Sequence, residues 1–158
     1  MSRIHLDEED IAIIGTSVRL PQADSLDIFW THLAKGNSLI TKVPQERWNV
    51  EELFGNPSKG NKTNSIWGGF LPDADCFDAE FFNISPREAV WMDPQQRFSL
   101  ELAWKAIEDA GYCPSSLAGS RTGVYMGVCH WDYAELIEKN LSHLDAYTPT
   151  GIAFSIIA

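Results

Sequence analysis

The sequence has little positive charge and no long apolar run, and each shortage excludes a class of protein. Its 158 residues carry 22 acidic and 12 basic side chains, a formal net charge of −10. That balance argues against a nucleic acid held through its phosphates and against an anionic membrane surface. No stretch reaches the ~18 uninterrupted apolar residues of a membrane span, and the acidic opening MSRIHLDEED is no signal peptide. We therefore expect a cytoplasmic location, with no nucleic-acid and no membrane partner.

Cysteine is also scarce, and the three thiols follow no disulfide framework spacing. Without a secretion signal, reduced thiols are expected for Cys76, Cys113 and Cys129. A catalytic thiol needs a base within reach. Cys129 precedes His130, but neighbouring residues of a strand point to opposite faces. Cys113 follows the end of a predicted helix, and the acidic residues around Cys76 disfavour a thiolate. All three are therefore expected to be spectators.

Other site chemistries lack at least one required residue. His130 and Asp132 are two metal ligands without a third. The segment GTSVRLPQ follows a strand-like run but lacks the glycines of a phosphate-binding loop. The acidic stretch DADCFDAE is expected to be a solvated turn with Asp78 as a cap, not a pair of catalytic carboxylates. The isolated histidines are His5, His32 and His143. The residues alone therefore predict no catalytic, cofactor or metal site.

What the sequence does have is two helix starts almost back to back, in ISPREAVWMDPQQR. In each, a capping side chain precedes a proline, and a Glu or Gln that can reach back to the cap's N–H follows three residues after the cap. Pro94 also ends the first helix, because it disfavours the helical conformation at Asp93. We predict a short helix, a sharp change of direction and a long helix, and we call residues 85–97 the elbow. Its predicted structural residues are Ser85, Pro86, Glu88, Asp93, Pro94, Gln96 and Arg97.

The long helix is predicted from Pro94 to Ala110, with Gly111 stopping it. One apolar stripe follows helical spacing, and Leu100 and Trp104 add apolar surface away from it. This pattern predicts a helix buried on more than one side, with Trp91 and Met92 driven into a core at the elbow. The stripe consists of Phe98, Leu102, Ala103, Ala106, Ile107 and Ala110.

Strands and helices alternate along the rest of the chain, which predicts an α/β protein. Ile11–Gly15 and Thr122–Cys129 resemble strands buried on both faces. The remaining predictions are a helix after Ser25 or Asp24 that stops at Gly36, a loop over residues 37–65, a hairpin or bulge at Ile66–Phe70, and a short helix opening at Asp132–Glu135. Two strands are few for such a sheet. The chain closes on GIAFSIIA, which predicts the start of a buried helix and further residues to cover it.

The elbow and its surroundings closely resemble the N-terminal part of a β-ketoacyl synthase (ketosynthase) domain of modular polyketide synthases. The longest match is GGFLPDADCFDAEFFNISPREAVWMDPQQRFSLELAWKAIEDAGY. Shorter matches occur in the family's order: IAIIGTSVRLP, FWTHLAKG, VPQERWN, GSRTGVYMG, DYAEL and DAYTPTG. Gln22 and Ile152 depart from the glycine and asparagine common in the family. The resemblance divides the chain into a polar lead, residues 1–10, and a ketosynthase portion, residues 11–158.

The resemblance implies an incomplete thiolase-like fold, the N-terminal part of its first half. Complete members form five layers, α/β/α/β/α, and usually dimerise. They catalyse decarboxylative Claisen condensation: a cysteine takes an acyl chain from the phosphopantetheine of an acyl carrier protein, and two histidines assist decarboxylation of a malonyl-type extender. The implied partners are the remaining ketosynthase polypeptide, an acyl carrier protein and a second copy of the complete domain. No directly bound cofactor is implied.

None of the family's catalytic residues can be assigned to this sequence. The family's cysteine lies in a serine-rich turn downstream of the TG…S…A segment, and both histidines come later, whereas these residues stop at Ala158. The chain alone is therefore expected to be inactive, and whether it is part of an enzyme stays open. Two alternatives remain: a non-catalytic interaction or dimerisation module of a polyketide synthase, and an unrelated small α/β binding domain.

Overall fold

The computed structural model describes residues 10–139 and 146–157, so His5, His143 and most of the polar lead lie outside the described residues. In chain order the elements are α1 (Leu26–Lys35), β1 (Thr41–Lys42), α2 (Val50–Leu53), η1 (Pro57–Lys59), β2 (Trp67–Gly68), α3 (Pro86–Ala89), α4 (Pro94–Asp109), η2 (Pro114–Leu117), α5 (Asp132–Lys139), α6 (Thr148–Ile152) and η3 (Phe154–Ile156). The helices marked η are short 3₁₀ turns.

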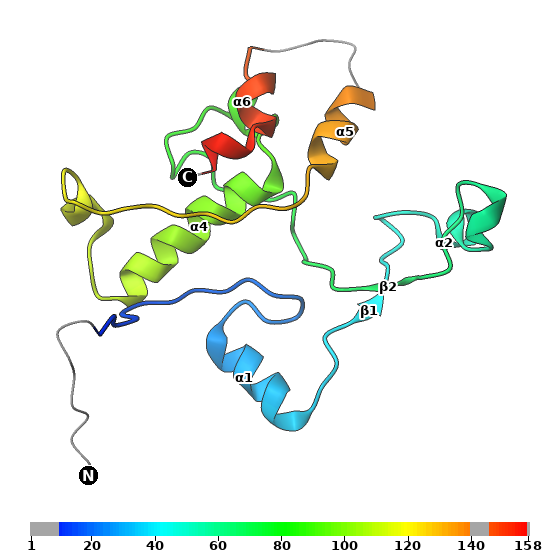
Figure 1. The fold of residues 1–158 in the computed structure, drawn as a ribbon, viewed down its shortest axis with the longest axis horizontal. Helices are drawn as coiled ribbons and strands as arrows, with labels where there is room; N and C mark the ends of the chain where they lie inside the picture. The colour runs from blue at the N-terminus through cyan, green and yellow to red at the C-terminus, as the bar shows by residue number, and fades with distance from the viewer. Residues whose placement is uncertain (1–9, 140–145, 158) are drawn as a thin grey trace.

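Helix α4 is the central element, and the other segments lie around it (Figure 1). The N-terminal segment and α1 lie on one side of it, while α5, α6 and the C-terminal end lie on the other. The N-terminal segment is tied to α4 by polar contacts. The amide of Thr16 donates to Asp109 Oδ2 at 2.9 Å, and Ser17 Oγ donates to the Leu102 carbonyl at 2.6 Å. These bonds hold residues that are distant in sequence against one helix.

The first helix forms as its sequence predicts, and the structure chooses between the two predicted caps. Ser25 Oγ accepts from the amide of Ile28 at 3.4 Å. Gly36 ends α1 in the left-handed conformation, at φ 66°, where glycine carries no steric penalty. No residue of α1 is fully buried, and Phe29 is half-buried, so the apolar stripe of α1 is only partly covered by the described residues.

The described sheet is small, and the prediction of a hairpin or bulge at Ile66–Phe70 is wrong. Trp67–Gly68 is itself a strand, paired antiparallel with Thr41–Lys42. The strand is not a turn because its partner lies about 25 residues away, a pairing that local turn chemistry does not reveal. Gly69 serves a close approach instead, since a Cβ there would lie 2.8 Å from Pro21 Cγ.

Neither of the two predicted buried strands is a strand in this structure. Ile11–Gly15 and Thr122–Cys129 have no regular secondary structure. Their side chains are exposed: 95% for Ile11, 85% for Ile13 and 94% for Tyr125. A strand needs a neighbour to complete its ladder of hydrogen bonds, and the described residues offer neither segment one.

The prediction that α4 is buried on more than one side is also wrong. Its only buried residues are polar, Gln96 and Arg97, while Leu100 and Ala103 of the predicted apolar surface are exposed. The reason is a shortage of covering layers, because the apolar residues that are buried are few and scattered. They are Ala23, Val43, Met92, Ala134 and Ile137. Met92 is thus buried at the elbow as predicted, and Trp91 is half-buried.

Trp104 packs against a cluster of aromatic rings rather than against a sheet. Its indole meets Phe81 edge-on, with 4.7 Å between ring centroids, and Phe82 at 6.3 Å. Phe77 stacks on Phe82 at 5.4 Å. The turn before the elbow is therefore packed against one side of α4 through aromatic contacts.

The C-terminal apolar run does not begin a buried helix within the described residues. Chain direction changes at Ala153, which is extended, and η3 then makes a single turn. Phe154 is 43% and Ile156 53% exposed. A short apolar helix is marginal unless packing covers its face, and the described residues do not cover this one. No helix in the described part of the chain is long and apolar enough to cross a bilayer.

Candidate functional site

The elbow carries many polar contacts among the described residues, and its two helix starts are capped by side chains. Ser85 Oγ accepts from the amide of Glu88 at 3.2 Å, and Pro86 occupies the first position of α3. Asp93 Oδ1 accepts from the amide of Gln95 at 2.8 Å, and Pro94 opens α4. Asp93 is only 4% exposed. A buried cap of this kind fixes the direction in which the long helix leaves the elbow.

The side chain of Gln96 does not reach back to its cap residue as predicted. The amide of Asp93 donates instead to the carbonyl of Gly151 at 2.8 Å. Gln96 Nε2 donates to the carbonyl of Thr150 at 3.0 Å and faces that of Ala153 at 3.4 Å. The Glu88 side chain likewise makes no bond to Ser85 in the part of the chain that the structure describes. Local spacing predicted a closed box, but a segment more than 50 residues away in sequence takes the elbow's donors.

The C-terminal segment, residues 147–157, approaches the elbow very closely. Gly151 is buried, and a Cβ on it would collide with the carbonyl of Trp91. Trp131 Nε1 donates to the carbonyl of Ile152 at 2.9 Å. The guanidinium of Arg87, on α3, lies 5.9 Å from the ring centre of Tyr147. The elbow and Trp131 together therefore contact this segment.

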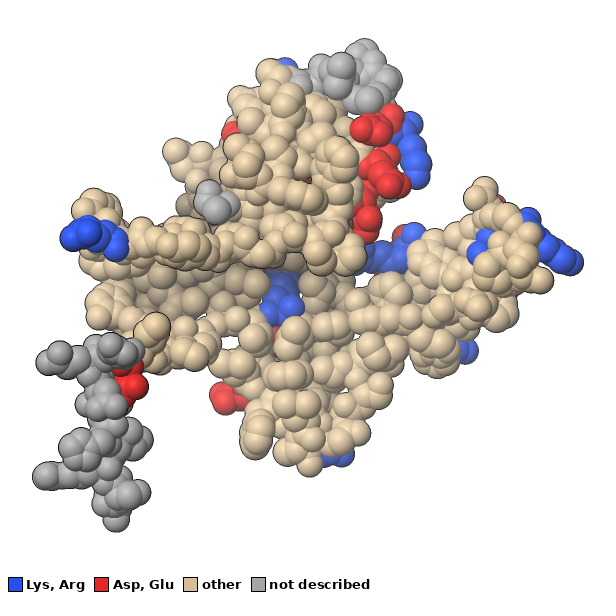
Figure 2. Space-filling view, in the orientation of Figure 1, with Lys and Arg blue, Asp and Glu red and all other residues tan. Residues whose placement is uncertain are grey.

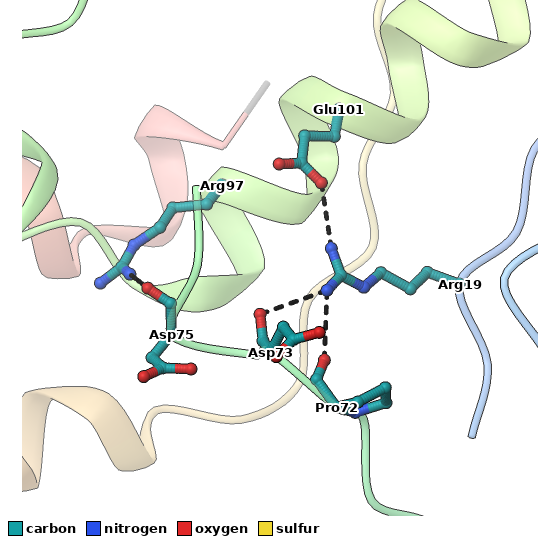
Figure 3. Close-up of polar contacts among 6 residues, drawn as sticks. All are labelled: Arg19, Pro72, Asp73, Asp75, Arg97 and Glu101. Carbon is teal, nitrogen blue, oxygen red and sulfur yellow. Dashed lines mark hydrogen bonds and ion pairs between the residues drawn. The ribbon is translucent and has the colours of Figure 1, made fainter. Parts of the chain in front are cut away.

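Arg97 joins the elbow to two other parts of the chain from a position that is 8% exposed. Its Nε and Nη2 donate to the Met92 carbonyl at 2.9 and 2.7 Å. Nη1 donates to the carbonyl of Asp75 at 3.2 Å (Figure 3). Nη2 donates to Tyr133 Oη at 3.2 Å. Tyr133 in turn donates to the carbonyl of Val90 at 2.6 Å. The guanidinium thus supplies donors to the buried carbonyl of Met92, which would be costly to leave without a hydrogen bond.

Arg19 makes a second bridge of the same kind, one turn further along α4. Its Nη1 pairs with Glu101 Oε2 at 3.0 Å, and its Nη2 donates to the carbonyls of Pro72 and Asp73, each at 3.2 Å (Figure 3). The guanidinium carbon also lies 4.4 Å from the ring centre of Phe98. Sequence reasoning missed Arg19, because its partner Glu101 lies 82 residues away and no local pattern marks the pair.

The acidic turn of residues 73–80 works through its backbone more than its carboxylates. The carbonyls of Asp73 and Asp75 receive the two arginines (Figure 3). Asp78 Oδ1 accepts from the amide of Phe81 at 3.0 Å, so its carboxylate caps the following turn. This turn is therefore an attachment point for Arg19 and Arg97.

The three thiols are all exposed, and none of them is hydrogen-bonded to a basic side chain among the described residues. Cys113 Sγ lies 3.0 Å from Ser115 Oγ. Hydrogen bonds from the Ser115 side chain and backbone lower the pKa of the Cys113 thiol. The Ser115 hydroxyl stabilises the thiolate form by hydrogen bonding and is not itself a general base.

The histidines and carboxylates of the described residues do not assemble into a metal centre. No group of three or more His, Cys, Asp or Glu side chains lies close enough there to hold an ion. His32 lies near the Asn37 amide, with 3.1 Å between Nδ1 and Nδ2. His130 uses its backbone carbonyl to accept from Gln95 Nε2 at 2.9 Å. On the face seen in Figure 2, acidic side chains gather over α5 and basic ones over the end that carries α2.

Fold and site together define part of an α/β protein, in which a polar elbow joins the long helix α4 to distant parts of the chain. The family model for the β-ketoacyl synthase N-terminal domain matches residues 8–158. The chain belongs to that family, as the elbow motifs predicted.

Curated relatives of this chain are large polyketide synthases. Polyketide synthase PksM of Bacillus subtilis is 45% identical over 157 residues, covering 95% of this chain and 4% of that protein. Polyketide synthase ThaG of Burkholderia thailandensis is 43% identical over 149 residues, covering 94% of this chain and 3% of that protein. The chain therefore spans a small fraction of each of these relatives.

Solved ketosynthase domains share its backbone arrangement. The oxazolomycin ketosynthase domain OzmH KS7 of Streptomyces albus aligns with a TM-score of 0.82 at 34% identity, covering 92% of this chain and 26% of that one. The ketosynthase from module 6 of the Bacillus subtilis bacillaene synthase, as a C167S mutant, aligns with a TM-score of 0.78 at 35% identity, covering 93% of this chain and 23% of that one. The incomplete thiolase-like α/β fold is thereby confirmed.

Proposed function

We propose that this chain supplies the first part of a polyketide synthase ketosynthase. In the complete domain, acyl and malonyl-type thioesters carried on the phosphopantetheine of an acyl carrier protein would undergo decarboxylative Claisen condensation. This chain would contribute scaffold, and a further ketosynthase segment would contribute the cysteine and both histidines. By itself the chain would condense nothing.

One observation supports this proposal above the others. The chain follows solved ketosynthases over 92% of its length, yet its Ile11–Gly15 segment carries apolar side chains into solvent. Buried-type strands without neighbours are expected of a part whose sheet is completed elsewhere. The unpaired strands make the remaining ketosynthase polypeptide the partner expected to bind this chain directly. The acyl carrier protein and a second copy of the complete domain would bind once the domain is assembled.

Co-expression with a chain carrying the remaining ketosynthase segment tests the proposal. The two parts should purify together, and the complex should become acylated by an acyl thioester on a carrier protein. Acylation is followed by intact-protein mass spectrometry, with the 158-residue chain alone as the matched control. The control should stay unlabelled. Two parts that purify separately, or a complex that is never acylated, would contradict the proposal.

The same experiment separates the alternative of a non-catalytic interaction module. Such a module would be monodisperse by itself and would bind the carrier protein without any ketosynthase segment. Its binding would also be indifferent to the presence of that segment. The exposed apolar residues near both predicted strands argue against a self-sufficient module, because patches of this kind favour association.

A further inference from the structure

The carbonyls at the end of α6 face several donors from outside the C-terminal segment, and the Ala153 carbonyl also accepts from the amide of Ile156 at 3.1 Å. The last carbonyls of a helix have no partners within it, and α6 has only five residues. Four successive carbonyls here face donors from other elements. Thr150 and Ala153 face Gln96, Gly151 accepts from the amide of Asp93, and Ile152 accepts from Trp131 Nε1.

Gln96 differs from the other donors because its single side-chain amide faces two of the carbonyls. Its Nε2 lies 3.0 Å from the oxygen of Thr150 and 3.4 Å from that of Ala153. The side chain is 4% exposed. Its two contacts span the residues at which the chain passes from α6 through extended Ala153 into η3. The side-chain amide of Gln96 therefore contacts the chain on both sides of the point at which its direction changes.

Apolar packing of this segment is partial, with the Phe154 ring 6.3 Å from that of Trp131 between centroids. Phe154 and Ile156 remain 43% and 53% exposed. The tight contact here is made by backbone, where Gly151 lies against the carbonyl of Trp91. Hydrogen bonds to the elbow and contacts with Trp131 together hold the last described residues.

We propose that Gln96 is a positioning residue, which holds the end of α6 so that the chain leaves Ile157 on the path required by the segment that follows. This inference rests on the proposed function, in which that segment brings the nucleophilic cysteine. Gln96 would not touch substrate. Small displacements of a reacting group are costly in rate, so releasing its approach segment should slow acylation without weakening substrate binding.

The first arm of the test measures amide hydrogen exchange in the 158-residue chain. Gln96→Ala should speed exchange across residues 148–157 by about three- to ten-fold, as loss of a buried hydrogen bond implies, and leave residues 100–109 of α4 unchanged. Gln95→Ala is the matched control. It removes an equal amide one residue earlier, which contacts Asp93 and His130 rather than the C-terminal segment. Equal exchange over residues 148–157 in both variants would overturn the positioning role.

The second arm uses the complete ketosynthase, assembled as described above. Gln96→Ala should lower kcat for acylation by about ten-fold with KM unchanged, and should shift the pH profile of cysteine alkylation by iodoacetamide. Gln96→Glu, which keeps shape but places an acceptor against carbonyls, should behave like Gln96→Ala, whereas Gln95→Ala should match the unmodified protein.

The two arms separate failure of this inference from failure of the proposed function. An unmodified complex that is never acylated contradicts the function, while the exchange arm still decides whether Gln96 holds the segment. An acylated complex in which Gln96→Ala has an unchanged kcat and an unchanged alkylation profile overturns the positioning role alone.

Discussion

The elbow and the segment Ile11–Gly15 carry equally strong sequence patterns but have opposite outcomes. At the elbow, Asp93 and Gln96 are each 4% exposed, and the side chains of both make hydrogen bonds. At Ile11–Gly15, apolar side chains of similar predicted burial stand in solvent, with Ile13 85% exposed. Polar residues are therefore buried where apolar residues are not, the reverse of the usual ordering.

The difference shows which interactions a partial sheet can complete by itself. Helix caps and bridging arginines satisfy backbone groups with side chains that the chain already possesses. A strand has no such substitute, because its amides and carbonyls need a neighbouring strand. Residues 10–139 and 146–157 thus keep their polar scaffold, while the two predicted buried strands stay unpaired.

Among the substitutions at the elbow, removal of Arg97 should lower the stability of the chain most. Arg97→Leu would leave the buried carbonyl of Met92 without its Arg97 donors and would remove the bonds to Asp75 and Tyr133, a loss of about 3 kcal/mol in the free energy of unfolding. Urea titration followed by tryptophan fluorescence measures this change. Arg121→Leu is the matched control, because Arg121 is exposed, and it should change stability by less than about 0.5 kcal/mol. Equal effects would mean that the Arg97 bridges contribute nothing specific.

Gly151→Ala tests the close approach at the elbow and should cost about 2 kcal/mol. The added Cβ would strike the carbonyl of Trp91, a backbone atom that cannot swing away. Gly127→Ala is the control, since a Cβ there meets nothing within 4 Å. Thermal unfolding should show a lower midpoint only for the first variant. A matching midpoint in both would show that α6 does not rest on the elbow.

The two helix caps should differ from each other by burial. Asp93→Ala, at a buried cap that also bonds the Gln95 side chain, should cost about 1–2 kcal/mol. Ser85→Ala, at an exposed cap, should cost about 0.5–1 kcal/mol. Urea titration of both variants against the unmodified chain gives the ranking. Unchanged stability in both variants would contradict a role for the caps. Ser85→Thr, which keeps a capping hydroxyl, should retain most of the stability that Ser85→Ala loses.

The sequence revealed what depends on nearby residues and misjudged what depends on distant ones. The starts of α3 and α4 follow from Ser85-Pro86 and Asp93-Pro94, and the end of α1 from Gly36, because caps act within one turn. The true partners of Gln96 and Arg19 lie 54 and 82 residues away, beyond any periodicity. Burial of Ile11–Gly15 was expected from composition alone, but burial requires a covering surface that no local pattern guarantees.

Ile13→Thr should have the smallest effect on the stability of the chain alone. It tests directly whether the segment Ile11–Gly15 is covered only in the complete ketosynthase. An 85% exposed side chain loses little when it becomes polar, so stability should change by less than about 0.5 kcal/mol. In the complete ketosynthase the same residue should be covered, and losing a buried aliphatic group there should cost about 1–2 kcal/mol. Urea titration of both forms gives the two values, with Ile13→Val as the shape-conserving control. A large effect in the chain alone would mean that Ile13 is already packed, whereas a negligible effect in both would mean that no strand covers it. A loss of stability confined to the complete form would show that the exposed segment becomes a paired sheet strand there.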